Sequence, residues 1–308
     1  MQTFASPTDV HAAIRRARAQ GLSVGCVPTM GALHAGHASL IERARAECSC
    51  VVATIFVNPT QFGPSEDFSR YPRTLDADLE ICRQAGADLV FTPSVPDMYS
   101  PDADTLVRVN RLSTVLEGAH RPGHFDGVTT VVAKLFLITE PDRAYFGQKD
   151  FQQQLIIRRM VRDLNFPVEM ITCPIVREPD GLAMSSRNRY LSAAERQTAT
   201  AISQALWHAE SLAAKPGTSP ASVAQALHQR LTAVPGIQLQ YALLADPETL
   251  AEVPEHTPIT SAVALVAARV GTTRLLDNHI LQFSSQQNPA DCSPTGQKMR
   301  EGQASSTP

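Results

Sequence analysis

Two histidines at close spacing form the most informative chemical pattern in the sequence. His34 and His37 stand in the segment VPTMGALHAGH, between an apolar run that predicts a strand and a periodic segment that predicts a helix. The start of a helix offers free backbone N–H groups and the positive end of a dipole, which both suit phosphate. Two imidazoles at this place can donate hydrogen bonds to charge that develops in phosphoryl or nucleotidyl transfer. The alternative is that both histidines only cap the helix.

Polar side chains also follow two other predicted strands. Asn58 and Gln61 stand in IFVNPTQFG, and their amides can bind hydroxyl and carboxyl oxygens. Lys149, Asp150 and Gln153 stand in FGQKDFQQ, where the lysine suits phosphate and the aspartate suits a helix cap or a ribose hydroxyl. An ordinary polar turn remains the alternative in both segments.

Three further segments carry charge near predicted turns. Arg187 lies in MSSRN, beside a turn, where hydroxyls and a guanidinium could close on phosphate oxygens. Arg121 and His124 lie in RPGHFDG, which could face an anion or only solvent. Asp76 and Asp78 lie near a helix start, where helix capping and a contact to Mg²⁺ are both open.

The segments between these motifs predict a doubly wound α/β domain. Short apolar runs alternate with periodic helical segments, which is typical of a parallel sheet built from right-handed strand–helix–strand units. We expect strands at 22–27, 50–57, 88–92, 143–146 and 168–172, and helices at 37–47, 76–85, 128–139 and 151–163. An amphipathic helix capped near Ser6 or Thr8 is expected before them. Binding crevices in such sheets lie at the carboxyl ends of the strands, so the polar segments should converge there.

The pattern changes near residues 175–185, where the Pro-Asp-Gly sequence indicates a turn. Beyond it we expect helices at 193–213 and 220–233 and strands at 237–244 and 262–270. The predicted organisation is a Rossmann-like domain over 1–175, a smaller α+β domain over 176–283 and a tail over 284–308. The tail is rich in Ser, Gln, Pro and Gly, which predicts disorder.

Composition excludes several classes of protein. The 27 Lys and Arg nearly balance the 30 Asp and Glu, so a nucleic acid is not expected as the main partner. No apolar run approaches the ~20 residues of a membrane span, and the N-terminal segment lacks the pattern of a secretory signal. The six cysteines form no CxxC pair, which favours buried reduced thiols and a cytoplasmic protein over a disulfide framework.

The HxGH and MSSR segments resemble the two signatures of the nucleotidyltransferase superfamily that includes class I aminoacyl-tRNA synthetases. Within it, the sequence is more similar to the pantothenate synthetase family, the pantoate–β-alanine ligases. The similarity rests on VPTMGALHAGH, IFVNPTQFG, YPRT, RPGHFDGV, YFGQKDFQQ and GLAMSSRNRYL, and a later GTTRLLDN segment also looks familiar. It covers about residues 1–282. The resemblance implies that pantoate attacks ATP to give pantoyl adenylate and pyrophosphate, and that β-alanine then displaces AMP to give pantothenate.

The resemblance also implies a role for each residue of these motifs. His37 would be the proton donor, acting with His34, Lys149 and Arg187 on the phosphates. Gln61 and Gln153 would bind pantoate, and Gln61 would later face β-alanine with Asn58 nearby. ATP would be bound by Met30, Gly31, Ala32, Leu33, His34, Ala35, Gly36, His37, Gly147, Gln148, Lys149, Asp150, Val176, Met184, Ser185, Ser186 and Arg187.

A metal ion and several binding partners are also expected. Mg²⁺ should accompany ATP. Some relatives carry adjacent acids where this sequence has Ala77 and Asp78, so Asp78 is a candidate ligand, and triphosphate oxygens and water are the alternative. Small-molecule substrates are expected, with no nucleic acid or membrane partner, and the family resemblance implies a homodimer. Two rival functions remain: another adenylyl- or cytidylyltransferase on the same fold, and a nucleotide-binding regulatory module without catalysis. The near-neutral charge and the lack of an obvious anticodon-binding domain disfavour a tRNA synthetase.

Overall fold

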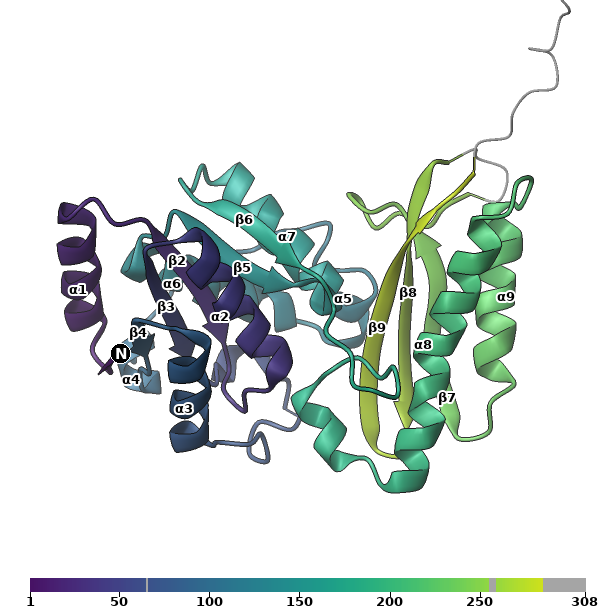
Figure 1. Cartoon of the computed structure of the whole chain (residues 1–308), viewed down its shortest axis with the longest axis horizontal. Coiled ribbons are helices and arrows are strands. Elements are labelled where there is room, and N and C mark those ends of the chain that lie inside the picture. The colour runs from purple at the N-terminus through teal and green to yellow at the C-terminus, as the bar shows by residue number, and fades with distance from the viewer. Residues whose placement is uncertain (65, 255–258, 285–308) are drawn as a thin grey trace, which may run out of the picture.

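The computed structural model describes residues 1–64, 66–254 and 259–284. Within these residues the strands form a six-stranded parallel sheet and a three-stranded antiparallel sheet. Figure 1 shows the two sheets in separate halves of an elongated molecule, each covered by helices. The sequence-based prediction of a Rossmann-like sheet followed by a smaller α+β unit is therefore confirmed as a fold class.

The large half alternates strands and helices along the chain. The sheet has the strand order β1-β4-β3-β2-β5-β6. Its direction of growth reverses beside β2, so β2 and β5 flank the point at which doubly wound sheets bind ligands. The elements are β1 (Gln2–Phe4), α1 (Pro7–Ala19), β2 (Val24–Thr29), α2 (Ala35–Glu47), β3 (Cys50–Ile55), α3 (Leu75–Ala85), β4 (Leu89–Phe91), α4 (Val95–Met98), α5 (Glu117–His120), α6 (His124–Thr139), β5 (Arg143–Gly147), α7 (Phe151–Asp163) and β6 (Glu169–Cys173).

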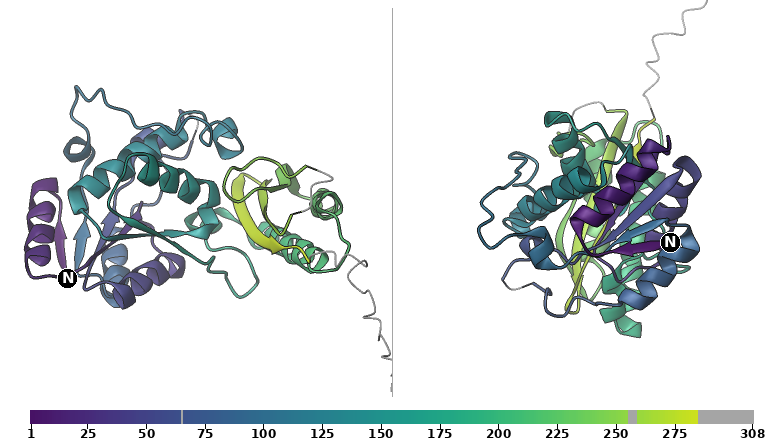
Figure 2. Two further views of the ribbon diagram at one scale, coloured as in Figure 1. Left: turned by 90° about the horizontal axis from the view of Figure 1, so that it is seen from above. Right: turned by 90° about the vertical axis from the view of Figure 1, so that its left-hand side faces the viewer.

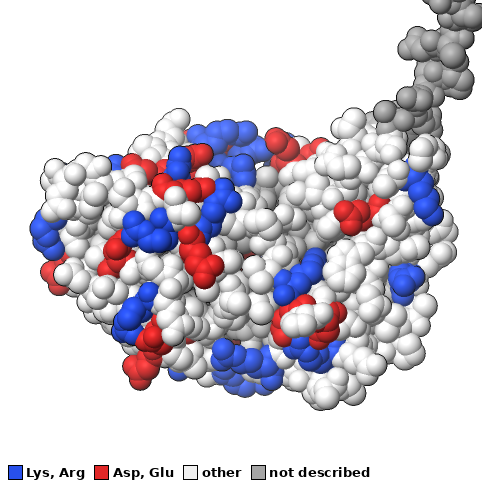
Figure 3. All heavy atoms as spheres, viewed as in Figure 1, with Lys and Arg blue, Asp and Glu red and all other residues white. Residues whose placement is uncertain are grey.

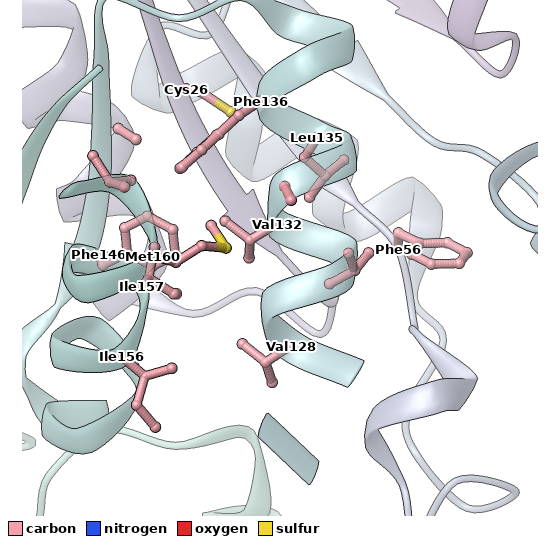
Figure 4. Packing of buried hydrophobic residues seen from close by; sticks show 14 of the residues in the cluster. Cys26, Phe56, Val128, Val132, Leu135, Phe136, Phe146, Ile156, Ile157 and Met160 are labelled. Carbon is pink, nitrogen blue, oxygen red and sulfur yellow. The ribbon is translucent and has the colours of Figure 1, made fainter. Parts of the chain in front are cut away.

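The two faces of this sheet bury different helices. Successive strand residues point to opposite faces, so Cys26 packs with α1, α6 and α7 whereas Val27 packs with α2 and α3. Figure 4 shows the first face, where Phe136 and Val132 of α6 pack against Met160 of α7. Both faces are apolar, as expected for parallel strands that are covered on both sides. This packing holds the carboxyl ends of β2 and β5 in place.

The small half packs two helices on an antiparallel sheet. Its elements are α8 (Ala193–Ala213), α9 (Pro220–Thr232), β7 (Ile237–Ala245), β8 (Ser261–Val270) and β9 (Thr273–Gln282). One core cluster joins α8 and α9 to this sheet. Figure 2 shows, in the view from above, that the chain between β6 and α8 runs from one half to the other. The sheet meets the large half through β9, which contacts the turn after β5.

Most predicted elements are present, with limits that differ by a few residues. The helices predicted at 151–163 and 193–213 have these limits in the structure, and α1 has Ser6 as its N-cap. The helix predicted at 128–139 begins earlier, at His124. The sequence reasoning missed β1, α4, α5 and β9. The predicted tail lies outside the described residues apart from residue 284.

The surface charges and the thiols can be compared with the composition. Figure 3 shows Lys and Arg interspersed with Asp and Glu on the face that it displays. Cys26, Cys48, Cys50, Cys82 and Cys173 are free and buried, whereas Cys292 lies outside the described residues. No helix in the described part of the chain combines the length and the apolar character that a membrane span requires.

Candidate functional site

A cleft of about 670 Å³ lies at the carboxyl ends of β2, β3 and β5, between the two halves. Loops after each of these strands contribute to its wall, together with β9 and the segment that follows β6. Among the expected site residues, the cleft is lined by Met30, His34, Gly36, His37, Asn58, Gln61, Arg121, His124, Gly147, Lys149, Asp150, Gln153, Val176, Met184, Ser185, Ser186 and Arg187. Gly31, Ala32, Leu33, Ala35, Gln148 and Asp78 do not line it.

His34 and His37 cap helix α2 with one nitrogen each. Nδ1 of His34 accepts a hydrogen bond from the backbone N–H of Gly36 at 3.2 Å. Nδ1 of His37 accepts one from the backbone N–H of His34 at 3.3 Å. The two ring centroids lie 4.1 Å apart. A neutral imidazole carries one proton, so both rings carry it on Nε2. The helix cap thus fixes both histidines as Nε2–H donors.

Both rings are held in the neutral form. Burial and the nearby Lys149 lower the pKa of His34 to about 4. Burial and the adjacent His34 lower the pKa of His37 to about 3. At neutral pH the two histidines therefore offer hydrogen-bond donors without a charge. An anion bound beside them would raise both pKa values, because it favours the protonated form.

Asp78 binds the loop that precedes these histidines. Its Oδ2 accepts from the backbone N–H of Ala32 at 2.9 Å, and its Oδ1 accepts from that of Leu33 at 2.8 Å. The hydroxyl of Thr74 donates to Oδ1 at 3.2 Å. Because both oxygens are engaged and the side chain does not line the cleft, this geometry argues against the expectation that Asp78 binds Mg²⁺.

Gln61 is held by Asn58 and by the start of helix α6. The amide of Asn58 donates to Oε1 of Gln61 at 3.2 Å and to the carbonyl of Gly127 at 3.1 Å. Asn58 is fully buried, and its own oxygen accepts from Thr60 and Tyr99. A Cβ on Gly127 would lie 2.4 Å from the carbonyl oxygen of Thr60, so this close approach requires glycine. Asn58 thus orients Gln61 and has no free group for a ligand.

Arg121 and His124 form a second support for Gln61. Nδ1 of His124 donates to the carbonyl of Gln61 at 2.7 Å, which leaves its Nε2 to accept from Arg121 at 2.9 Å. The guanidinium of Arg121 also binds both oxygens of Glu66, at 2.7 and 2.5 Å. Burial and the nearby Arg121 lower the pKa of His124 to about 4. The sequence left solvent or an anion as partners for this segment, and the structure provides Glu66.

The MSSR segment contacts the large half through two side chains. The hydroxyl of Ser186 donates to the carbonyl of Ala32 at 3.0 Å. The guanidinium of Arg187 binds Asp67 with two hydrogen bonds, at 3.1 and 3.0 Å, and lies over the ring of Tyr71. Arg187 therefore has a carboxylate partner at the wall of the cleft.

The turn after β5 is fixed by a strand of the small half. The amide of Asn278 donates to the carbonyls of Gln148 and Lys149 at 3.0 Å each. Nζ of Lys149 lies 3.8 Å from Oδ1 of Asp150, and both residues line the cleft beside Gln153. Asn278 is buried, so it fixes the turn and leaves the lysine to face the cleft.

Sequence reasoning missed the residues that join the two halves. Glu117 of α5 binds Arg274 of β9, and it also accepts from the hydroxyl of Tyr241 at 2.6 Å. Arg177, in the segment that connects β6 to α8, binds Asp277 of β9 through two hydrogen bonds, at 2.6 and 3.0 Å. The charged residues of the GTTRLLDN segment were the available signal, since Arg274 and Asp277 both lie in it.

The fold and the cleft define a class of enzyme. A parallel α/β sheet carries a histidine-capped helix, a lysine turn and an arginine loop at its switch point, which is an arrangement for nucleotide phosphates. The protein is therefore a nucleotide-dependent transferase or ligase of the α/β type.

Comparison with known proteins identifies the family. The profile of the pantoate-beta-alanine ligase family matches residues 2–280. The pantothenate synthetase of Moorella thermoacetica is 52% identical over 286 residues, which span 92% of this chain and 99% of that protein. The pantothenate synthetase structure from Thermus thermophilus has a TM-score of 0.86 and 48% identity, over 91% of this chain and 99% of that one.

A third relative is a pantoate-beta-alanine ligase from Francisella tularensis, whose crystal structure holds beta-gamma ATP and beta-alanine. It has a TM-score of 0.73 and 33% identity, over 91% of this chain and 97% of that one. The chain belongs to the pantoate–β-alanine ligase family. The family and the ligase activity expected from the sequence are thereby confirmed, and the transferase and regulatory-module alternatives are set aside.

Proposed function

We propose that the cleft binds ATP and pantoate, forms pantoyl adenylate, and then transfers the pantoyl group to β-alanine. The observation that carries this assignment is the pair of neutral histidines whose Nε2–H donors share the cleft with Lys149 and Gln61. In the first step a pantoate carboxylate oxygen bonds to the α-phosphorus, and the bond to pyrophosphate breaks. In the second step the amine of β-alanine bonds to the acyl carbon and AMP leaves.

The cationic and donor groups of the cleft suit the first step. A carboxylate that attacks a triphosphate is repelled by its charge, and Lys149 and Arg187 offset that repulsion. His34 and His37 donate to oxygens on which charge develops. His37 becomes a proton donor once the bound anion has raised its pKa, which is the role that the family resemblance implies.

The amide groups suit the substrates that carry no phosphate. Gln61 and Gln153 line the cleft and hydrogen-bond to carboxylate and hydroxyl oxygens without adding a charge that would compete with the phosphates. Gln61 then faces β-alanine in the second step. Asn58 contributes by holding the amide of Gln61, which revises its expected part in binding β-alanine.

The remaining nucleotide contacts follow from the placement of the loops. Met30, Gly36, Gly147, Asp150, Val176, Met184 and Ser185 line the cleft, so we assign them to ATP, with Asp150 at the ribose and Val176 at the adenine. Gly31, Ala32, Leu33, Ala35, Gln148 and Ser186 act mainly by shaping these loops, since Ser186 is bonded to Ala32. A hinge between residues 1–175 and 176–283 would let the second unit shield the adenylate from water.

Mg²⁺ is proposed to enter with ATP. The described residues contain no group of three or more His, Cys, Asp or Glu side chains arranged to hold a metal ion. Asp78 has both oxygens engaged by the backbone. The part of the chain that the structure describes thus offers no such ligand set, and the triphosphate and water would hold the ion.

We also propose a cellular compartment and an oligomeric state for the protein. Buried free thiols favour a reducing compartment, which supports the cytoplasm. A homodimer is supported by family membership and by the exposed Leu106, Leu137 and Leu164 on the large half. Sedimentation that shows a monomer at all concentrations would contradict the homodimer.

The test uses pantoate-dependent exchange of pyrophosphate into ATP, which reports the first step alone. The second step is measured as AMP formation that requires both acids. H37A and K149A should each lower the exchange rate at least ~100-fold, about 3 kcal/mol of transition-state stabilisation. H228A, which replaces an exposed histidine of α9, is the control and should leave the rate unchanged.

A second pair of variants separates chemistry from helix capping. In H37N the amide oxygen occupies the place of Nδ1, so the cap is kept and the Nε2–H donor is lost. In H37Q the amide reaches the place of Nε2, so the donor is kept and the cap is lost. We expect H37Q to retain at least ~10-fold more exchange activity than H37N. If H37N is as active as wild type, His37 only caps the helix.

A further inference from the structure

The carboxylate of Asp78 has a structural position that the reaction alone does not explain. Only 2% of the residue is exposed, although it carries a charge and lies beside a nucleotide cleft. A buried carboxylate is costly unless it is hydrogen-bonded, and here two backbone amides and the hydroxyl of Thr74 meet that need. All these groups are donors, as a carboxylate requires.

The loop that Asp78 binds has an unfavourable backbone conformation. Gly31 has φ of 78° and Ala32 has φ of 50°, and the second value is uncommon for a residue with a side chain. The tight turn brings the N–H groups of Ala32 and Leu33 to one carboxylate, which acts as a fixed internal anion. Asp78 therefore stabilises a turn that the chain would not favour by itself.

This turn determines where two cleft residues lie. His34 follows Leu33 directly and begins helix α2, so its ring position depends on the end of the turn. The carbonyl of Ala32 accepts from the hydroxyl of Ser186 at 3.0 Å, which joins the turn to the MSSR segment. One carboxylate on α3 thus connects, through three residues of backbone, to both sides of the nucleotide cleft.

We propose that Asp78 is a positioning residue for adenylate formation, which sets His34 and Ser186 through the turn at residues 31–33. The inference rests on the proposed function, because it assigns a task to the histidine pair. It differs from a role in binding Mg²⁺, for which the carboxylate would have to face the cleft and have a free oxygen.

The test compares D78N with D76N. Asp76 is exposed two residues away on the same turn of α3, so D76N removes a neighbouring charge without touching the loop. In D78N one amide oxygen replaces two carboxylate oxygens, and its NH₂ group faces a backbone N–H. Binding of ATP is measured by calorimetry in EDTA, without metal, and the exchange rate is measured over a range of Mg²⁺ concentrations.

We expect D78N to bind metal-free ATP about 10–100-fold more weakly, as for the loss of a charge-assisted hydrogen bond. The Mg²⁺ concentration for half-maximal exchange should stay within twofold of wild type, and D76N should match wild type in both assays. Unchanged metal-free binding in D78N, with a tenfold higher requirement for Mg²⁺, would overturn the inference in favour of a metal ligand. Absence of ATP binding by wild type would instead refute the proposed function.

A milder variant keeps the test decisive if D78N does not fold. T74V removes one of the hydrogen bonds to Asp78 and leaves the carboxylate in place. We expect T74V to bind metal-free ATP twofold to tenfold more weakly. The ¹⁵N NMR signals of the His34 ring should also move away from the values of the tautomer that is protonated on Nε2. Wild-type ATP affinity together with an unchanged His34 signal would contradict the proposal.

Discussion

The contact of Gly127 with the turn at Pro59–Gln61 leads to a prediction about pantoate. In G127A the new Cβ would lie 2.4 Å from the carbonyl oxygen of Thr60 and 2.7 Å from the backbone nitrogen of Gln61. Real Cβ contacts begin near 3.0 Å, so helix α6 and the turn must separate by at least about 0.6 Å. Neither partner can yield by a rotamer change, because both atoms belong to the backbone.

Two opposing terms set the size of the effect on stability. Overpacking against rigid backbone costs up to about 3 kcal/mol. Replacing glycine by alanine within a helix raises the free energy of unfolding by up to about 1 kcal/mol. We therefore expect G127A to lower the free energy of unfolding by about 2 kcal/mol. The shift also moves Gln61 away from its partners Asn58 and His124, and a displacement near 1 Å can cost about 100-fold in rate. Since this shift is smaller, kcat/KM for pantoate should fall about 10–100-fold.

The assays are urea unfolding and pantoate-dependent pyrophosphate exchange at a temperature where the variant is fully folded. G63A is the matched control, because its Cβ meets nothing closer than 3.7 Å and Gly63 lies two residues after the same turn. It should match wild type within about 0.5 kcal/mol. Lower stability of G127A with unchanged kcat/KM for pantoate would show that this contact does not position Gln61. Unchanged stability would refute the packing argument itself.

Two further predictions concern charges and protons. E117Q removes the charge that Arg274 binds between the halves, and breaking such a buried pair should cost about 3–5 kcal/mol in urea unfolding; a loss below ~1 kcal/mol would contradict a structural role for the pair. The pKa of His124 in the folded state, about 4, lies below its ordinary value, so the unfolded state binds the extra proton and stability falls as the pH drops from about 6.5 to 4. H124N keeps a donor to the carbonyl of Gln61 but has no group that titrates in this range. The loss of stability between pH 6.5 and 4 should therefore be up to about 3 kcal/mol smaller in H124N than in wild type. If both proteins lose the same stability over this range, the lowered pKa of His124 is refuted.

The sequence was a good guide wherever a local pattern decides the structure. Helix α7 has the predicted limits because its apolar residues repeat at helical spacing between Asp150, which is the N-cap, and Asp163. The HxGH segment lies between a strand and a helix as expected, and it both caps the helix and lines the cleft. Of the two possibilities that the sequence left open for these histidines, the structure contains the helix cap, and each ring keeps its second nitrogen for the proposed contact with phosphate.

Partners that are distant along the chain could not be predicted in this way. Strand β9 was missed because Asp277 and Asn278 interrupt its apolar pattern, and their partners lie in other elements. Asp78 resembled a metal ligand because its partners are backbone amides 46 and 45 positions away, which no side-chain pattern reveals. Arg187 and Asp67 are 120 positions apart, so only the folded chain brings them together.

Two arginines of the cleft already have carboxylate counter-ions within the protein, since Arg121 pairs with Glu66 and Arg187 pairs with Asp67. Both carboxylates come from one short loop, and both arginines line the cleft. An incoming anion that binds either guanidinium must release a carboxylate, so its affinity is the difference between two pairings. Small anions such as chloride make single contacts and gain little from this exchange. A ligand with several oxygens can replace both carboxylates at once, and its arrival would free the loop as a unit.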